Sequence, residues 1–206
     1  MPISDCEVRD PRIRRTRQLL QGALSSLMQT KAFDEISVQD IAEAATVNRA
    51  TFYDHYTDKF SLLEALVGGG FHKLLHERNV LFDGTCPSAA GAIILAACDY
   101  LTQNHADSSA CGRQNAFQPL VDAAMISAIH RVLARGIKDI EPTPVVSADM
   151  IATTASWAIY GAVKQWFNTP NHPPAEAIVP SVLQLILPIL QQSHPYAVPH
   201  EADRVA

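Results

Sequence analysis

Residues 36–59 read ISVQDIAEAATVNRATFYDHYTDK. Val38 and Ile41 begin a helical apolar spacing, so the first part of this segment predicts a helix with one buried face. Ser37 stands immediately before that helix, where its hydroxyl can accept a hydrogen bond from a free backbone N–H of the first turn. The pattern breaks at Thr46, which predicts a turn.

A second, shorter helix is predicted from Asn48 to His55. Asn48 can cap it, and Phe52 and Tyr56 lie four residues apart on one face. Two short helices joined by a tight turn form a helix-turn-helix. The second helix is too short to bury much surface, so its polar side chains indicate a partner outside the fold.

Those polar side chains suit DNA. Asn48 and Arg49 carry donors that can reach base edges in a major groove, and hydroxyl, phenol, imidazole and ammonium groups suit phosphate oxygens. Packing alone gives no reason to gather such groups on one short helix, which argues against the alternative of a small helical core with solvated faces. We expect DNA contacts from Arg14, Arg15, Ser37, Val38, Gln39, Asn48, Arg49, Ala50, Thr51, Tyr53, His55 and Lys59.

The block resembles the DNA-binding domain of TetR/AcrR-type transcriptional repressors. The resemblance covers roughly residues 13–63 and rests on the run FYDHY at residues 52–56, followed by Lys59. It implies an all-α protein with an N-terminal three-helix helix-turn-helix domain and a C-terminal helical bundle for ligand binding and dimerisation, about nine helices in all. The family usually has glycine in the turn, where this chain has Thr46. Either the turn differs or a β-branched residue is strained there.

The charge distribution fits a DNA-binding head on a body that does not bind DNA. The whole chain has a net charge of −5, but residues 9–60 carry eight Lys and Arg against seven Asp and Glu. Residues 61–206 carry eight against twelve. Because salt screens charges beyond a Debye length of about 10 Å, the local balance decides phosphate affinity.

A helix is predicted from Arg12 to about Thr30. Its four arginines lie largely off the apolar stripe: Arg12, Arg14, Arg15 and Arg17. Cations at a helix N-terminus oppose the macrodipole, so a DNA phosphate would relieve a local cost. The alternative is a solvated cationic helix end.

The expected organisation is a DNA-binding domain at 11–57, a connecting helix at 58–78 and a regulatory and dimerisation domain at 84–192. Residues 1–10 and 193–206 are expected to be disordered. By resemblance, the connecting helix carries ligand-driven movement to the head. Its Gly68-Gly69-Gly70 triplet weakens a helix and indicates either close packing or a hinge.

Helices are expected in the body at about 88–104, 119–137, 145–167 and 174–190. An unidentified small apolar or aromatic effector is expected among Tyr100, Phe117, Met125, Trp157 and Tyr160, although aromatic residues at helical spacing are also ordinary core. Trp157 and Tyr160 are placed opposite a small-residue face of their helix. By resemblance the last two helices form a homodimer interface, expected at Ala158, Gly161, Ala162, Val182, Ile186 and Ile189; an intrachain core is the alternative.

Other function classes find less support. No G-x-S-x-G, Gly-rich phosphate loop or H-E-x-x-H occurs, so neither an enzyme nor a cofactor is expected. His72 and His76 lie four apart but lack an assignable third ligand, so no metal is expected. The four scattered cysteines favour reduced thiols. The first residues lack the apolar stretch of a signal peptide, and no apolar run is long enough to span a membrane, so a cytoplasmic protein is expected.

The sequence therefore predicts a sequence-specific transcriptional regulator, a repressor that a ligand releases from a palindromic double-stranded DNA operator. An effector-independent architectural DNA-binding protein and a metal- or thiol-sensing repressor are the alternatives.

Overall fold

The computed structural model describes residues 10–80, 86–106, 118–138 and 146–191. Within these ranges the chain is all-α, as predicted, with eight α-helices and one short 3-10 helix. They are α1 (Pro11–Met28), η2 (Phe33–Glu35), α2 (Val38–Ala44), α3 (Arg49–His55), α4 (Lys59–Glu77), α5 (Pro87–Ala106), α6 (Gln118–Lys138), α7 (Ala148–Asn168) and α8 (Ala175–Leu190). The expected disorder at both ends concerns residues that lie outside the described ranges, except for residue 10.

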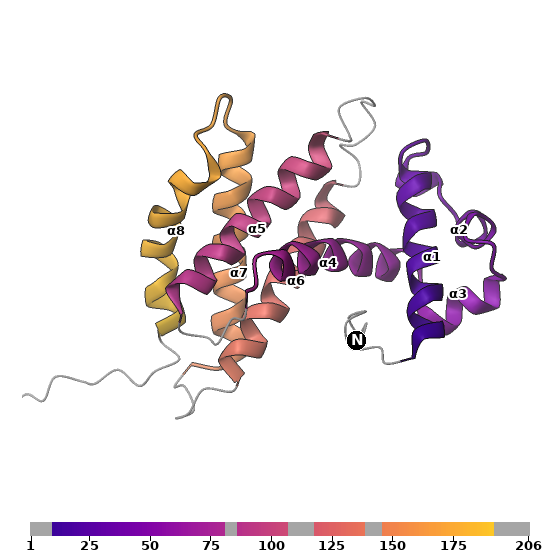
Figure 1. Cartoon of the computed structure of the whole chain (residues 1–206), viewed down its shortest axis with the longest axis horizontal. Helices are drawn as coiled ribbons and strands as arrows, with labels where there is room; N and C mark the ends of the chain where they lie inside the picture. Colours follow the sequence, from indigo (N-terminus) through magenta and orange to yellow (C-terminus); the bar gives the residue numbers. More distant parts are fainter. Residues whose placement is uncertain (1–9, 81–85, 107–117, 139–145, 192–206) are drawn as a thin grey trace, which may run out of the picture.

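The helices form a head and a body joined by one long helix (Figure 1). Helices α1, α2 and α3 lie together at one end, and α4 runs from them into the body formed by α5–α8. Helix α4 packs against α1 on the head side and against α5 and α6 on the body side. Among the described residues, none of these helices combines the length and apolarity needed to cross a membrane.

Side-chain caps fix the two helices of the predicted helix-turn-helix. The Ser37 hydroxyl accepts a hydrogen bond from the Asp40 backbone N–H at 3.1 Å, and the Asp40 carboxylate accepts from the Ser37 N–H at 2.8 Å, which is a capping box. Hydrogen bonds from Ser37 and from Lys31 hold the pKa of Asp40 well below its ordinary value. Asn48 Oδ1 accepts from the Thr51 N–H at 3.0 Å. Both predicted caps are confirmed.

The turn between these helices holds a β-branched residue in a left-handed conformation. Thr46 has a φ of 57°, and its N–H donates to the Glu43 carbonyl at 3.0 Å. The Val47 N–H donates to the Ala42 carbonyl at 2.9 Å. This pair of bonds is a Schellman motif, which usually has glycine at the left-handed position. The turn is therefore the ordinary one, with Thr46 in the left-handed conformation that glycine usually takes, and strain at this residue stays a prediction.

The head core is built on aromatic side chains. Phe33, Phe52 and Tyr56 are buried, and the Gln21 amide donates to the Tyr56 hydroxyl at 3.1 Å. Arg17 corrects a prediction: it does not lie off the apolar stripe but is only 6% exposed, with its guanidinium carbon 5.2 Å from the centroid of the Tyr56 ring. The delocalised cation can be buried there because an aromatic face attracts it.

Lys59, the first residue of α4, joins that helix to the start of the helix-turn-helix. Its ammonium donates to the backbone carbonyls of Phe33 at 2.9 Å, Asp34 at 3.1 Å and Ile36 at 2.9 Å. A lysine ammonium has three N–H donors, so this loop uses all of them.

The glycine triplet lies inside an unbroken α4, where two of the three glycines are in close contact with other helices. A Cβ at Gly68 would lie 3.0 Å from Arg131 Nη2 of α6, and one at Gly70 would lie 3.0 Å from Cε2 of Tyr100 of α5. A Cβ at Gly69 would come no closer than 3.9 Å to Gln21. These contacts favour the close-packing interpretation for Gly68 and Gly70, while the hinge stays a prediction.

We expect Thr46→Gly to stabilise the protein by about 1 kcal/mol. The strain of a β-branched residue in the left-handed region exceeds the roughly 0.5–1 kcal/mol of extra chain entropy that glycine brings to the unfolded state. Chemical denaturation of the full chain measures the difference. Thr46→Asn should fall between the two, since asparagine tolerates this conformation; a lower unfolding midpoint for Thr46→Gly would show that no strain is held there.

We expect Gly69→Ala and Gly70→Ala to differ in stability, although both gain about 1 kcal/mol of helix propensity. The alanine methyl at position 69 makes only an ordinary van der Waals contact with Gln21 at 3.9 Å, whereas at position 70 it presses on the buried Tyr100 ring. Thermal unfolding should therefore give a higher midpoint for Gly69→Ala than for Gly70→Ala. Equal midpoints would contradict the packing interpretation of this contact.

Candidate nucleic-acid interface

Helix α3 divides into a buried aromatic side and an exposed polar side. Phe52 is fully buried, whereas Asn48, Arg49 and Tyr53 are exposed. Arg49 Nη2 donates to the Tyr53 hydroxyl at 3.1 Å, and the guanidinium lies 5.5 Å from the centroid of that ring. The pair holds Arg49 along the helix surface and leaves the side chain exposed.

The remaining expected contacts of this region surround that exposed side. Ala50, Ser37 and Gln39 are exposed, while Val38, Thr51 and His55 are half-buried. The Gln39 amide donates to the Glu43 carboxylate at 2.6 Å. Burial and the nearby Arg17 cation lower the pKa of His55, so at neutral pH its imidazole is an uncharged hydrogen-bonding group.

The basic residues at the start of α1 are exposed and can contact phosphates, whereas the ammonium of Lys59 is already hydrogen-bonded within the head. Arg14 and Arg15 lie on the first two turns of α1, whose N-terminus is capped by Asp10 through a 2.8 Å bond from the Arg12 N–H. All three N–H donors of Lys59 are bonded to backbone carbonyls. We therefore assign Lys59 to the folding of the head, because no donor remains for the predicted phosphate contact.

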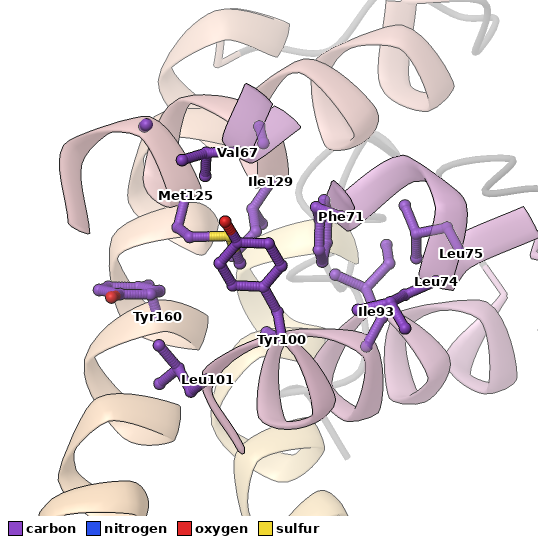
Figure 2. Close-up of a cluster of buried hydrophobic side chains, with 14 of the residues drawn as sticks. Val67, Phe71, Leu74, Leu75, Ile93, Tyr100, Leu101, Met125, Ile129 and Tyr160 are labelled. Atoms are coloured by element: carbon purple, nitrogen blue, oxygen red, sulfur yellow. The ribbon is translucent and has the colours of Figure 1, made fainter. Parts of the chain in front are cut away.

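The body residues expected at an effector site fall into three groups. Tyr100, Met125 and Tyr160 are buried, and Figure 2 shows them side by side in the cluster that joins α4, α5, α6 and α7. Phe117 lies outside the described residues. Trp157 was wrongly placed: it is 63% exposed, on the same face of α7 as Ala158 and Gly161 rather than opposite them.

A polar network beside this cluster was missed by the sequence reasoning. The Asp122 carboxylate of α6 accepts hydrogen bonds from the Tyr160 hydroxyl at 2.6 Å, Lys164 at 3.0 Å and Gln118 at 2.8 Å. Burial raises the pKa of Asp122, but these bonds outweigh it and the pKa lies below its ordinary value. The spacing of Tyr160 and Lys164, four residues apart on one helix, was the available signal.

The residues expected at a dimer interface divide between surface and core. Ala158 and Gly161 of α7 are exposed, and Ala162 is half-buried. Val182 and Ile186 correct the prediction: they are buried in the chain's own core, with Ile186 at 0% exposure, so they present no surface to a partner. Ile189 is half-buried against the same core.

The sequence reasoning missed two exposed apolar side chains near this surface. Met150 of α7 and Leu185 of α8 are exposed, Leu185 by 71%. Helix α8 is apolar on nearly all sides, so the sequence alone did not tell which side α5 and α7 would cover. We use the name α7–α8 face for the exposed residues Met150, Trp157, Ala158, Gly161 and Leu185.

Where the structure describes them, the histidines and cysteines behind the sensing alternatives form no metal-holding group, and Cys98 is buried. In the described part of the chain, no group of three or more His, Cys, Asp or Glu side chains could hold a metal ion. Burial raises the pKa of the Cys98 thiol to about 12, which suppresses its reactive thiolate. Cys86 is half-buried, with its sulfur 2.8 Å from the Ser88 hydroxyl, and Cys6 and Cys111 lie outside the described residues.

Comparisons with known proteins agree with the geometry of the head. Residues 20–66 match the family model described as bacterial regulatory proteins, tetR family. The HTH-type transcriptional regulator YxbF of Bacillus subtilis (strain 168) is 41% identical over 59 residues, which cover 28% of this chain and 16% of that protein. The HTH-type dhaKLM operon transcriptional activator DhaS of Lactococcus lactis subsp. lactis (strain IL1403) is 31% identical over 64 residues, or 31% of this chain and 34% of that protein.

The similarity in fold extends well beyond the matched segment. A TetR-family regulator from Streptomyces coelicolor A3 aligns over 89% of this chain and 99% of its own, with a TM-score of 0.59 and 17% identity. At that identity the alignment shows the fold and nothing about ligands. The matched residues 20–66 include the whole helix-turn-helix and the first turns of α4. Residues 20–66 therefore carry the helix-turn-helix segment of the bacterial regulatory proteins of the tetR family, and the chain spans less than two thirds of the length of the curated relatives it matches.

Proposed function

We propose that the chain acts in the cytoplasm as a homodimeric, sequence-specific repressor that leaves a palindromic operator when a small apolar or aromatic ligand binds. The supporting observation is the geometry of α3, which buries Phe52 and exposes Asn48 and Arg49. Because Ser37 and Asn48 cap the two helices, the exposed side is held rigidly. A helix with this geometry can enter a major groove.

Base reading falls to Asn48 and Arg49, and positioning to groups around them. An arginine can donate two hydrogen bonds to a guanine, and an asparagine can pair with an adenine in the same way. Thr51, Tyr53 and His55 supply neutral hydrogen-bonding groups for phosphate oxygens. Arg14 and Arg15 supply positive charge beside α3, since α1 packs against α2 and α3.

A second copy of the chain supplies the second recognition helix. One short helix reads too few bases for a specific site, and paired heads read two half-sites about 34–36 Å apart. The α7–α8 face supports this pairing because Trp157 exposes a large apolar side chain next to the small residues Ala158 and Gly161 on α7, and Leu185 exposes another on α8, which packs against α7. Small residues allow two helices to approach closely, and exposed apolar surface of this kind marks protein interfaces.

Ligand control rests on the connection through α4. A ligand that binds one arrangement of the body better than another shifts the protein toward it, and linkage requires that DNA affinity change with it. DhaS carries the word activator in its name, but its sequence match covers only 64 residues, 31% of this chain, and does not determine the direction of regulation. We keep repression as the proposal.

Arg49→Ala is expected to relax sequence preference at one position of each half-site, with a loss of about 1–3 kcal/mol for the preferred base. Selection of bound duplexes from random DNA, with the unchanged protein beside the variant, measures this preference. Arg15→Ala is the matched control: it should weaken binding to every sequence and lower the salt dependence of affinity. If Arg49→Ala keeps the full preference, α3 does not read bases in the proposed way.

Leu185→Glu is expected to convert the dimer to a monomer, because it places a charge within the apolar α7–α8 face. Sedimentation of the full chain measures the change in mass. Leu19→Glu serves as control, since Leu19 is also exposed but lies on α1 of the head. Dimerisation through the α7–α8 face is wrong if both variants sediment as the unchanged protein does.

A further inference from the structure

A cleft of about 300 Å³ lies between α4 and α6, on the side of α4 nearest the head. Most of its wall is apolar, and it is lined by Phe60, Leu63, Glu64, Leu120, Ala123, Ala124 and Ser127. It is separate from the buried cluster of Tyr100, Met125 and Tyr160 in Figure 2, because none of those residues lines it. Its volume is at the lower end for small-molecule sites.

One end of the cleft carries the Glu64 carboxylate, which forms an ion pair with Arg131. Glu64 Oε1 accepts hydrogen bonds from the Ser127 hydroxyl at 2.8 Å and from Arg131 Nη1 at 2.5 Å. Within the described part of the chain both bonds end on Oε1, so Oε2 can accept a further hydrogen bond. Burial raises the pKa of Glu64, but the bonds from Arg131 and Ser127 outweigh it and the pKa lies below its ordinary value. The carboxylate is therefore ionised at neutral pH.

We propose that this cleft binds a small organic cation, an amine carried on a compact aromatic or aliphatic body. The apolar body would lie against Leu63, Leu120 and Ala124, and the ammonium would donate to Glu64. A carboxylate of the same shape has no hydrogen-bond donor to offer Glu64 Oε2, and a neutral molecule would lack the charge-assisted bond. The inference rests on the proposed ligand-controlled function and names the chemical class of the ligand.

The position of the cleft connects its occupant to the helix-turn-helix. Phe60 is 48% exposed on the cleft side, and its ring centroid lies 5.5 Å from that of Phe33, edge to face. Its neighbour Lys59 holds the carbonyls of Phe33, Asp34 and Ile36, immediately before the Ser37 cap of α2. A ligand that presses on Phe60 therefore acts on the segment that positions α2 and α3.

The occupant would also change the contact between α4 and α6. Arg131 reaches Glu64 beside Gly68, where a Cβ would lie only 3.0 Å from Arg131 Nη2. A ligand ammonium that donates to the Glu64 carboxylate competes with Arg131 for it and weakens the bridge between them. Helix α4 would then have two arrangements against α6, one with the Glu64–Arg131 bridge intact and one with it weakened. The ligand would bind the second more tightly, and such a difference in affinity is what ligand control of DNA binding requires.

The test compares three probes of similar shape on the full chain: phenethylamine, phenethyl alcohol and hydrocinnamate. Ligand-observed NMR titration measures each affinity. We expect phenethylamine to bind about tenfold more tightly than phenethyl alcohol, and hydrocinnamate to bind more weakly than either. Equal affinities for the amine and the alcohol would overturn the proposal.

Variants assign the binding to the cleft. Glu64→Gln should remove the preference for the amine, whereas Glu77→Gln should keep it, because Glu77 lies at the far end of the same helix in an exposed pair with Lys73. Ala123→Phe should reduce the affinity of both amine and alcohol by filling the cleft from an exposed position that tolerates a larger side chain. Unchanged amine affinity in Ala123→Phe would overturn the proposal even if Glu64→Gln does not fold.

A DNA measurement separates this inference from the proposed function. Duplexes are selected first without any probe, and their affinity is then measured with saturating phenethylamine; it should fall for the unchanged protein and not for Ala123→Phe. If duplexes are enriched but phenethylamine binds no more tightly than phenethyl alcohol, the inference fails and the proposed DNA-binding regulator stands. If the amine binds through Glu64 and no duplex is enriched, the cation site stands and the proposed function fails.

Discussion

The contact on which the structure depends is the ammonium of Lys59 among three backbone carbonyls. Phe33 and Asp34 lie in the short helix η2 and Ile36 follows it, all in the connection between α1 and α2, and of the three carbonyls that of Phe33 also accepts a hydrogen bond from the Ile36 N–H at 3.2 Å. A buried or half-buried carbonyl needs a donor, and a lysine supplies three from one point. Because Lys59 also begins α4, the same contact fixes the direction in which the long helix leaves the head.

From this contact the orientation of the body follows through α4. Gly68 and Gly70 let α6 and α5 approach the helix closely, and Glu64 is bonded to Ser127 and Arg131 of α6. The rigid head, the connecting helix and the body therefore share a continuous set of packed and hydrogen-bonded contacts. Continuity of this kind is what a ligand bound between α4 and the body needs in order to change the position of α3.

The local features of the head could be read from the sequence because they depend on neighbours in the chain. Ser37 and Asn48 cap helices that begin at the next residue, and the left-handed turn at Thr46 follows from the end of a helix. Contacts between distant residues could not be read in this way. Arg17 was expected off the apolar stripe, near a phosphate or in solvent, and lies on Tyr56. Lys59 was expected on phosphate and bonds carbonyls more than twenty residues before it.

By itself the sequence determined that the chain is all-α, that residues 36–59 form a helix-turn-helix, and that α3 has one apolar and one polar side, since helical spacing and caps are properties of short segments. Only the tertiary structure decided which apolar residues are core and which are surface. Ile186 and Leu185 are adjacent in an apolar helix, yet one is buried and the other exposed, because the neighbours α5 and α7 cover a single side of α8. The cleft with Glu64 was likewise invisible in the sequence, because its walls come from helices whose facing residues are more than fifty positions apart.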